Sequence, residues 1–322
     1  MTITVRPFHR SDARDVSEVR RRVLPYGIST PQSVAWEVAE APAARRLKVL
    51  VAEAGGRVVG VVKASVRHDS STAGQGVVAP LVDPGYRGLG TGRALLDAAE
   101  EHLAGLGATH LHAYPQDDPR SLAFAERRGY RRLRVARYLR LDLAHAALPP
   151  LPASLPPGTE LRTAADFGAD PRPLFAADAE VTADEPDDLT VDAMTYEDWI
   201  VHTWEHPDTD LDLTTVVTVD GEVAAFSLAV TDGQGRYGSE MTGTRRAYRA
   251  RGLARLAKTD SLRRARDACC TEAFTSNDAE NAPMLAVNAA LGYRPFAAEW
   301  HCVRALRRAR PTGAPADAPS PV

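Results

Sequence analysis

The chain has 322 residues, of which 44% are apolar and 25% are charged, and its formal net charge at pH 7 is −3. This length is enough for two ordinary domains with a buried core each, and the small negative charge gives no reason to expect nucleic acid or an anionic membrane as a partner. The N-terminus lacks the apolar stretch of a signal peptide and no run reaches membrane-spanning length, so we expect a cytoplasmic protein.

The first half is predicted to alternate strands and helices. In chain order the segments are a strand at 4–8, helices at about 12–26 and 30–44, a hairpin over 49–66, a strand at 77–82, a long helix after Gly90, a strand at 109–114, a short helix ending at Gly129-Tyr130, and an apolar last strand. The hairpin turns at Gly55-Gly56, because two glycines between β-branched runs favour a tight turn. Leucine and alanine at helical spacing predict the long helix.

A proline-rich stretch, AHAALPPLPASLPPG, divides the chain nearly in half. Repeated prolines exclude helix and favour an extended linker. We therefore expect an N-terminal domain at 1–143, a linker at 144–158, a C-terminal domain at 159–308 and a disordered tail at 309–322.

The second half repeats the order of the first. Its segments are a strand at 159–163, a hairpin over 214–230 turning at Asp220-Gly221, a strand at 239–244, a long helix after Gly252, a strand at 270–275, a short helix ending at Gly292-Tyr293, and an apolar last strand. The stretch YRGLGTGRALL at 86–96 returns as YRARGLARLAK at 248–258, 162 residues later, and the Gly-Tyr pairs lie 163 residues apart. Two matched spacings predict an internal duplication, with a final strand closing each half.

The two glycine-bearing turns have the chemistry of a phosphate or pyrophosphate site. Each lies before the first turn of a helix, where unpaired N–H groups and the positive end of the helix dipole attract an anion. Glycine allows close approach, and Arg87 and Arg93 add positive charge in the first copy. No Gly-Lys-Ser/Thr is present, which excludes a P-loop, and the glycine spacing does not fit a dinucleotide fold. A turn that only makes a tight corner is the alternative.

Arg87-x-x-Gly90-x-Gly92 and Arg249-x-x-Gly252-x-Ala254 resemble the (Gln/Arg)-x-x-Gly-x-(Gly/Ala) motif of the GNAT superfamily of N-acyltransferases. The approach VDPGYRG before the first turn resembles the same family, as do Asn281, Met284 and Asn288-x-x-x-Gly292-Tyr293 in the second half. The layout is similar to that of tandem GNAT proteins of actinobacteria, of which mycothiol synthase is one branch. The resemblance implies an α/β (α+β) protein of two GNAT folds in tandem, each a mixed, mostly antiparallel sheet flanked by helices, with a splayed fourth and fifth strand.

The resemblance also implies acetyl-CoA as the acyl donor, with its pyrophosphate on the glycine turn and its pantetheine arm along the fourth strand. In the first half the implied binding residues are Leu81, Val82, Arg87, Gly88, Leu89, Gly90, Thr91, Gly92 and Ser121. In the second half they are Thr242, Gly243, Thr244, Arg249, Ala250, Arg251, Gly252, Leu253, Ala254, Asn277 and Asn281. No metal is expected, since the three cysteines lack metal-ligand spacing.

Within the family, a backbone N–H seven residues before the motif arginine commonly meets the thioester oxygen. That position is Thr242 in the second half, whereas the first half has Pro80, which has no N–H to donate. Glu240 is expected on the same strand face as Thr242 and could act as a general base, where the first half has Val78. The C-terminal half is thus favoured as the catalytic one, with the N-terminal half a CoA-binding copy. The reverse stays open, because the first half has the more complete glycine turn and a bulge would shift the register.

The tyrosine that often protonates the leaving thiolate in the family is missing, since Ala125 and Asn288 stand in its place. The other side chains considered as acids are His112, Tyr114, His202 and His206. Each of these is more often a packing or surface residue than an acid.

The acceptor is expected beside the segment 178–199, which is dense in carboxylates and would attract a cationic amine. Its clustered acids are Asp184, Glu185, Asp187 and Asp188, and its tryptophan Trp199 could, with Trp204, wall a pocket or belong to the core. The leading hypothesis is a monomeric or homodimeric N-acetyltransferase of a small-molecule amine. The alternative is a non-catalytic CoA-binding protein that regulates or stabilises a partner.

Overall fold

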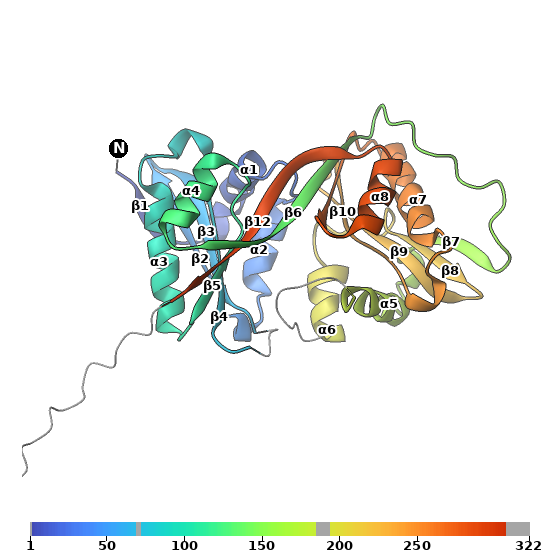
Figure 1. Ribbon diagram of the computed structural model, residues 1–322, viewed down its shortest axis with the longest axis horizontal. Helices are drawn as coiled ribbons and strands as arrows, with labels where there is room; N and C mark the ends of the chain where they lie inside the picture. Colours follow the sequence, from blue (N-terminus) through green and yellow to red (C-terminus); the bar gives the residue numbers. More distant parts are fainter. Residues whose placement is uncertain (1, 69–71, 185–193, 307–322) are drawn as a thin grey trace, which may run out of the picture.

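The computed structural model describes residues 2–68, 72–184 and 194–306 and contains two halves joined by a pair of long, curved strands (Figure 1). The strands of these residues form one 12-stranded sheet in the order β1-β2-β3-β4-β5-β12-β6-β11-β10-β9-β8-β7. The strand numbers rise from β1 to β5 across the first half and fall from β11 to β7 across the second, as expected of a duplicated chain. The exception is the central pair, because β12 lies next to β5 and β6 lies next to β11.

The element bounds follow the predicted order in both halves. The first half contains β1 (Thr4–Pro7), α1 (Ala13–Val23), α2 (Pro31–Ala39), β2 (Lys48–Ala54), β3 (Arg57–Val66), β4 (Gln75–Val82), α3 (Thr91–Gly105), β5 (His110–Ala113), α4 (Pro119–Arg127) and β6 (Arg131–Asp142). The second half contains β7 (Thr159–Thr163), α5 (Arg172–Thr182), α6 (Tyr196–Trp199), β8 (Thr215–Val219), β9 (Glu222–Thr231), β10 (Arg236–Thr244), α7 (Leu253–Asp267), β11 (Glu272–Asp278), α8 (Ala282–Ala290) and β12 (Arg294–Ala305). Residues 146–158, within the expected linker, contain no helix or strand.

Both predicted hairpins are confirmed. Strands β2 and β3 pair as antiparallel neighbours around Gly55-Gly56, and β8 and β9 do so around Asp220-Gly221. All four turn residues have positive φ, between 52° and 84°, which is the backbone that a two-residue hairpin of this kind requires. The helix predicted at 30–44 is shorter, because Pro42 disfavours helical backbone in the residue before it and α2 ends at Ala39.

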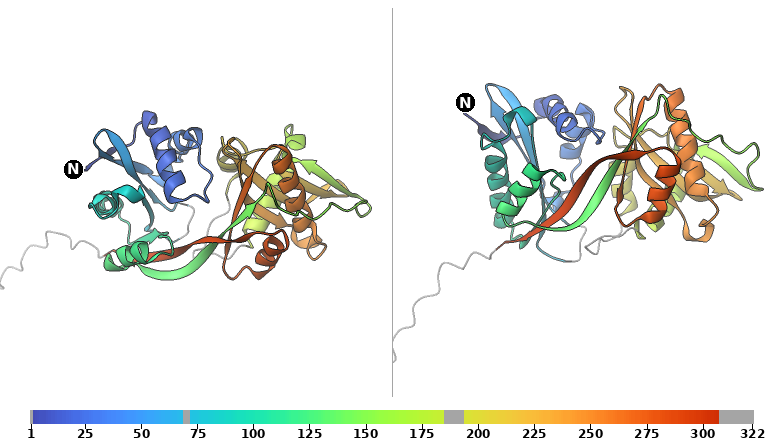
Figure 2. Two further views of the ribbon diagram at one scale, coloured as in Figure 1. Left: turned by 90° about the horizontal axis from the view of Figure 1, so that it is seen from above. Right: turned by 45° about the horizontal axis from the view of Figure 1, so that its top comes forward.

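The prediction that each half is closed by its own last strand is wrong. Strand β5 pairs with β12 from the second half, and β11 pairs with β6 from the first. Strands β6 and β12 then pair with each other from Arg131↔Val303 to Arg140↔Arg294. Each long strand therefore contributes one segment to the sheet of either half, and Figures 1 and 2 show the two running side by side between the halves.

The fourth and fifth strands of each half splay apart, as the fold prediction requires. Parallel pairing of β4 with β5 stops at Val78↔Ala113, and that of β10 with β11 stops at Ser239↔Thr275. Beyond these pairs the backbone groups on the facing strand edges have no ladder partner on that side. Each half thus has an opening in its sheet where an extended ligand could complete the hydrogen bonding.

The loop after α1 fixes the two halves against each other. Arg236 on β10 donates through its guanidinium to the carbonyl oxygens of Pro25 and Gly27. A Cβ built on Gly238 would come within 3.0 Å of the Ile28 side chain, so this glycine lets the loop pack directly on β10. The N-terminal loop therefore lies at the mouth of the C-terminal opening.

Candidate active site

The glycine turn of the first half presents its backbone to a cavity. Gly88 and Gly90 have φ of 83° and 88°, a backbone region that other residues rarely adopt, and Gly90 is the N-cap of α3. The Thr91 hydroxyl donates to the Tyr86 carbonyl (3.2 Å), which holds the turn from within. The free N–H groups at the start of α3 therefore point into open space, as an anion site needs.

A cavity of about 1120 Å³ begins at this turn. It is larger than the roughly 300–1,000 Å³ typical of small-molecule pockets, so it has room for a long ligand. Gly88, Gly90 and Gly92 line one end, and Leu81 and Val82 line the wall along β4. The cavity thus extends from the predicted phosphate site along the sheet opening.

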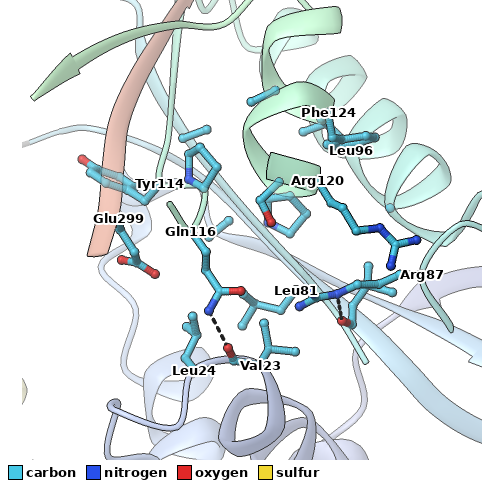
Figure 3. A pocket seen from close by; sticks show the side chains of 18 of the residues that line it. Val23, Leu24, Leu81, Arg87, Leu96, Tyr114, Gln116, Arg120, Phe124 and Glu299 are labelled. Carbon is cyan, nitrogen blue, oxygen red and sulfur yellow. Dashed lines mark hydrogen bonds between the residues drawn. The ribbon is translucent and has the colours of Figure 1, made fainter. Parts of the chain in front are cut away.

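Arginines gather at the glycine end of the cavity. Arg87, Arg93 and Arg120 line it, and in the part of the chain that the structure describes none of the three forms a salt bridge with a carboxylate. Arg87 donates to the Val82 carbonyl (3.2 Å), and Arg120 lies over Gly88 from the start of α4 (Figure 3). Three cations around exposed N–H groups fit a diphosphate, and these residues would hold that part of acetyl-CoA.

One backbone N–H donor is missing from the edge of β4 that faces the opening. The β3–β4 register runs without a shift, and Asp83 donates its N–H to Val59 on β3 (2.9 Å). Since N–H groups alternate between the edges of a strand, Val82 directs its N–H toward the opening and Pro80, in the same alternation, has none. The bulge that could have moved Pro80 out of this position is absent from β4.

The opposite end of the cavity is formed by the exchanged strand β12. Glu299 lies there, across the cavity from Arg87 (Figure 3). It is 9% exposed and accepts hydrogen bonds from Tyr26 and Tyr138, both at 2.7 Å. Burial raises the pKa of the Glu299 carboxyl, and the two phenol donors oppose this rise.

A second cavity of about 310 Å³ adjoins the first and opens at the splay of β10 and β11. Three residues, Tyr114, Tyr138 and Glu299, line both cavities. The other residues that line the second cavity are Arg134, Ala136, Glu240, Ser276, Asn277, Asp278, Asn281 and His301. The openings of the two halves thus meet at one polar wall.

In the glycine turn of the second half, a carboxylate pairs with the arginine of the motif. Gly252 caps α7 with φ of 75°, and Ala250 has φ of 61° in place of the first copy's Gly88. Asp184, just beyond α5, pairs with Arg249 and with Arg246 (2.5 Å). These hydrogen bonds lower the pKa of Asp184 to about 2, so the carboxylate is charged at neutral pH. The motif arginine of the second turn, Arg249, is therefore paired with an acidic side chain, whereas its equivalent Arg87 forms no salt bridge within the described residues.

The prediction that Glu240 and Thr242 share a strand face is wrong. A bulge between Ser239 and Thr242 puts two residues of β10 opposite one residue of β9. The Thr242 hydroxyl consequently lies with the Ser227 and Ser239 hydroxyls, at 3.0 and 3.1 Å. Glu240 instead lines the second cavity and keeps an exposed surface there, while loss of hydration against the surrounding protein and the charge of Asp208 raise its pKa.

The other predicted binding residues differ in their exposure and in their contacts. Ser121 lines the large cavity, and Asn277 and Asn281 line the small one. Leu89 is 56% exposed, whereas Thr91 and Leu253 are buried. Gly243 packs against Val181, because a Cβ there would lie 2.3 Å from that side chain. Thr244 accepts from Arg249 (3.2 Å), Arg251 stacks on Tyr248, and Ala254 lies in the first turn of α7.

The candidate acids occupy different surroundings. Tyr114 is 41% exposed, lines both cavities and stacks on His301 with ring centroids 5.1 Å apart. His112 is buried and bonded to His301 and Gln75, both at 2.8 Å. His202 and His206 belong to the turn after α6 and line neither cavity.

Only part of the acidic segment 178–199 lies within the described residues, whereas Trp199 and Trp204 are both described. Of the clustered acids, Asp184 is described, whereas Glu185, Asp187 and Asp188 lie outside the described residues. Trp199 is 2% exposed and donates to Asp178 (2.7 Å), and Trp204 packs against it, so these rings belong to the core of the second half.

Among residues 2–68, 72–184 and 194–306, no group of three or more His, Cys, Asp and Glu side chains is arranged to hold a metal ion. The described helices include none that is both long and apolar enough to cross a bilayer.

The sequence analysis missed Arg120, Tyr26, Tyr138 and Glu299. Arg120 could have been found from its place at the start of the helix that follows the fifth strand, where Ser121 was expected to bind. The other three had no local signal, because the strand exchange and the packing of the loop after α1 bring them together.

Comparison with known proteins supports the architecture. The model of the acetyltransferase (GNAT) family matches residues 16–130. A mycothiol acetyltransferase of Frankia alni is 40% identical over 109 residues, which cover 33% of this chain and 32% of that protein. A mycothiol acetyltransferase of a Nocardioides species is 29% identical over 227 residues, 66% of this chain and 75% of that protein.

Two solved structures share the whole fold. A tandem GNAT protein from the clavulanic acid biosynthesis pathway superposes with a TM-score of 0.70 at 22% identity, covering 94% of this chain and 98% of its own. A GCN5-related N-acetyltransferase from Sphaerobacter thermophilus gives a TM-score of 0.68 at 19% identity, covering 94% and 95%. Residues 16–130 therefore match the GNAT acetyltransferase family, and the chain as a whole has the fold of a tandem GNAT protein.

Proposed function

We propose that this chain is an N-acetyltransferase that moves an acetyl group from acetyl-CoA to a small amine, and that acetyl-CoA binds in the large cavity of the N-terminal half. The observation that carries the proposal is the single cavity that begins at the glycine turn with Gly88 and Gly90 and ends at Glu299. It joins a site for a diphosphate to a carboxylate that can receive an amine.

The N-terminal site has what binding of the donor needs. Exposed N–H groups and three arginines without carboxylate partners face the diphosphate, and the splayed edge of β4 can pair with an extended arm. When bound, acetyl-CoA supplies the thioester carbon that the amine attacks. The contribution of this chain is to bind both reactants close together and to accept the proton of the ammonium.

The sequence favoured the C-terminal half as the catalytic one, and two observations still support that assignment. Thr242 has a backbone N–H where Pro80 has none, and Glu240 lies in the smaller cavity with a raised pKa. Against it, binding of a diphosphate at the second turn has to displace Asp184 from Arg246 and Arg249. We therefore assign donor binding to the first half, the assignment that the sequence left open.

The acceptor is proposed to be a cationic amine, because Glu240 and Glu299, both from the second half of the chain, line the cavities where these adjoin. The relatives from Frankia alni and Nocardioides are named mycothiol acetyltransferases, so an amine related to mycothiol belongs among the acceptors to be tested. A cytoplasmic monomer or homodimer is the form we expect.

Release of free thiol from acetyl-CoA in the presence of an amine panel tests the function. The panel contains ethanolamine, glucosamine, putrescine and a tripeptide amide. We expect release that depends on one or more amines and is lost in Gly92→Asp, since a carboxylate at this pocket-lining position repels a diphosphate. Stabilisation of the fold by CoA without release with any amine would instead support the non-catalytic, CoA-binding alternative.

A further inference from the structure

Strand β12 brings a carboxylate from the second half into the cavity of the first. Glu299 pairs as a backbone bridge with Gln116 on one side and lies opposite Ala136 of β6 on the other. It therefore lies at the middle of the two-stranded connection, where both cavities meet. The N-terminal half has Val78 at the position where the second half has Glu240, so it has no carboxylate of its own on β4.

We propose that Glu299 is the residue of the N-terminal site that receives the ammonium of the acceptor and takes its proton. The inference rests on the proposed function and names the acceptor as a small primary amine that carries further hydrogen-bonding groups. It is carried by the position of the side chain at the end of the donor cavity, by its two hydroxyl donors, and by the polar lining of the adjoining cavity.

The two tyrosines orient the carboxylate and leave it able to accept more. Tyr26 donates to one oxygen of Glu299 and Tyr138 to the other. A carboxylate has about four lone-pair sites, so each oxygen can accept one further hydrogen bond from an ammonium group. The rings of Tyr26 and Tyr138 pack together with centroids 4.0 Å apart, which fixes both donors.

The side chains around Glu299 leave its negative charge available to a cationic ligand. Tyr26 reaches it from the loop after α1 and Tyr138 from β6, while Glu240 on β10 lines the adjoining cavity. Arg134 on β6 also lines that cavity, but it pairs with Asp278 on β11 (3.0 Å). The partners of Glu299 among the described residues are neutral hydroxyls, so no guanidinium already neutralises it.

The smaller cavity indicates what else the amine carries. Ser276, Asn277 and Asn281 line it from β11 and the start of α8. Asn277 and Asn281 already accept from Asn288 and from the Met284 N–H through their amide oxygens, so their amide N–H groups and the Ser276 hydroxyl remain to bind hydroxyl or carbonyl oxygens of a ligand. The acceptor class is therefore a polar primary amine such as an amino sugar, an amino alcohol or an amino-acid amide.

The proton transfer balances as follows. Glu299 accepts one proton from the ammonium, and the neutral nitrogen forms its bond to the acetyl carbon as the carbon–sulfur bond breaks. The nitrogen passes its second proton to the departing sulfur, which leaves as the thiol, and Glu299 returns the first proton to water. Neither an oxidant nor a metal is needed.

The test compares Glu299→Gln with Glu240→Gln and with Glu272→Gln, whose carboxylate on β11 pairs with Arg140 on β6 and lines neither cavity. Binding of glucosamine and ethanolamine is measured by calorimetry without acetyl-CoA, and thiol release is measured from pH 6 to pH 10. We expect Glu299→Gln to weaken amine binding at least tenfold and to lower kcat/KM about 100-fold near pH 7, as typical for loss of a general base. The deficit shrinks as pH approaches the pKa of the amine, because the amine is then neutral without help. Glu272→Gln stays within threefold of the wild type.

Three outcomes overturn the inference. The first is that Glu299→Gln keeps amine binding and activity within threefold of the wild type. The second is that only Glu240→Gln causes the loss. The third is that the deficit of Glu299→Gln is equal at every pH, which indicates a structural role. Tyr26→Phe with Tyr138→Phe provides a second test that keeps the carboxylate: it lowers kcat/KM, while thermal stabilisation by CoA is retained. If the wild-type chain releases no thiol with any amine, the proposed function fails and the inference with it; if only the Glu299 comparison fails, the function stands.

Discussion

The two glycine turns of this protein have similar sequences and different surroundings. In the first, Arg87 reaches only the Val82 carbonyl and the turn opens into a large cavity. In the second, Arg249 reaches the equivalent Thr244 carbonyl but also pairs with Asp184 from the end of α5. The motif determines the shape of the turn in both halves. A single carboxylate, distant in sequence, distinguishes the surroundings of the second turn from those of the first.

The helices that follow the two turns, α3 and α7, also differ in one buried side chain. Position 96 of α3 is a leucine, 3% exposed, whereas the equivalent position of α7 is Lys258, 1% exposed. The Lys258 ammonium donates to Thr275 (3.1 Å) and lies 5.2 Å from the centre of the Tyr293 ring. Burial lowers the pKa of Lys258 to about 7, because no carboxylate compensates the lost hydration.

The largest effect is expected from Lys258→Leu, which makes α7 resemble α3. In wild type, the folded-state pKa lies below the unfolded value, so the unfolded state gains protons first and stability falls as pH drops from about 10.5 to about 7. At about 1.4 kcal/mol per pKa unit, removing the amine should raise the free energy of unfolding at pH 7 by about 2–4 kcal/mol. Denaturant unfolding at pH 7 and pH 10 measures this.

The gain should be smaller at pH 10 than at pH 7, because the wild-type penalty fades as the unfolded lysine loses its proton. Leu96→Met serves as the control for a volume change at the equivalent position of α3. An equal gain at both pH values would show that packing rather than charge separates the two helices.

A second pair of variants compares the turns themselves. Gly92→Asp and Ala254→Asp place a carboxylate in the first turn of α3 and α7, at positions where backbone φ is ordinary for any residue. A negative charge beside the diphosphate should weaken CoA binding on the order of 100-fold in Gly92→Asp, since it opposes the helix dipole and the arginines there. Ala254→Asp should change it less than threefold. Calorimetric titration with CoA measures both, and the reverse order would show that the second turn is the one occupied.

The smallest effect is expected from Asp184→Asn, which removes the negative charge from the second turn. Arg246 and Arg249 then become available, and we expect a second, weaker CoA-binding event that Asp170→Asn, at another exposed ion pair, does not produce. Because the folded pKa of Asp184 is lowered to about 2, its ion pairs contribute fully above about pH 4 and are lost as pH falls toward 2. Wild type should consequently gain CoA sites below pH 4 if it stays folded, whereas titration curves of one site at every pH would contradict this role of Asp184.

Local patterns predicted the elements of the fold well. Gly55-Gly56 and Asp220-Gly221 marked the hairpins because positive φ at both turn residues is nearly specific to such sequences. The duplication spacing predicted the equivalence of the halves. The strand exchange had no such signal, since β6 and β12 are both strands of 12 residues and their local sequences do not indicate which half each one joins.

The site was predicted only where its chemistry is local. The residues of the first glycine turn line the large cavity, as a turn motif can indicate. The placement of Glu240 failed because one bulge in β10 changes the face of every later residue, and sequence alternation cannot show a bulge. Glu299, Tyr26 and Tyr138 are brought together by packing across more than 100 residues of sequence, which no local pattern encodes.

The central claim is that the open turn of the first half holds the donor. A crystal structure of the full chain with CoA tests it most directly. We expect the diphosphate against residues 88–92, in contact with Arg87 and Arg120, and the thiol end directed toward Tyr114 and Glu299. Density for CoA only at the turn around Gly252, with Asp184 displaced, would contradict it.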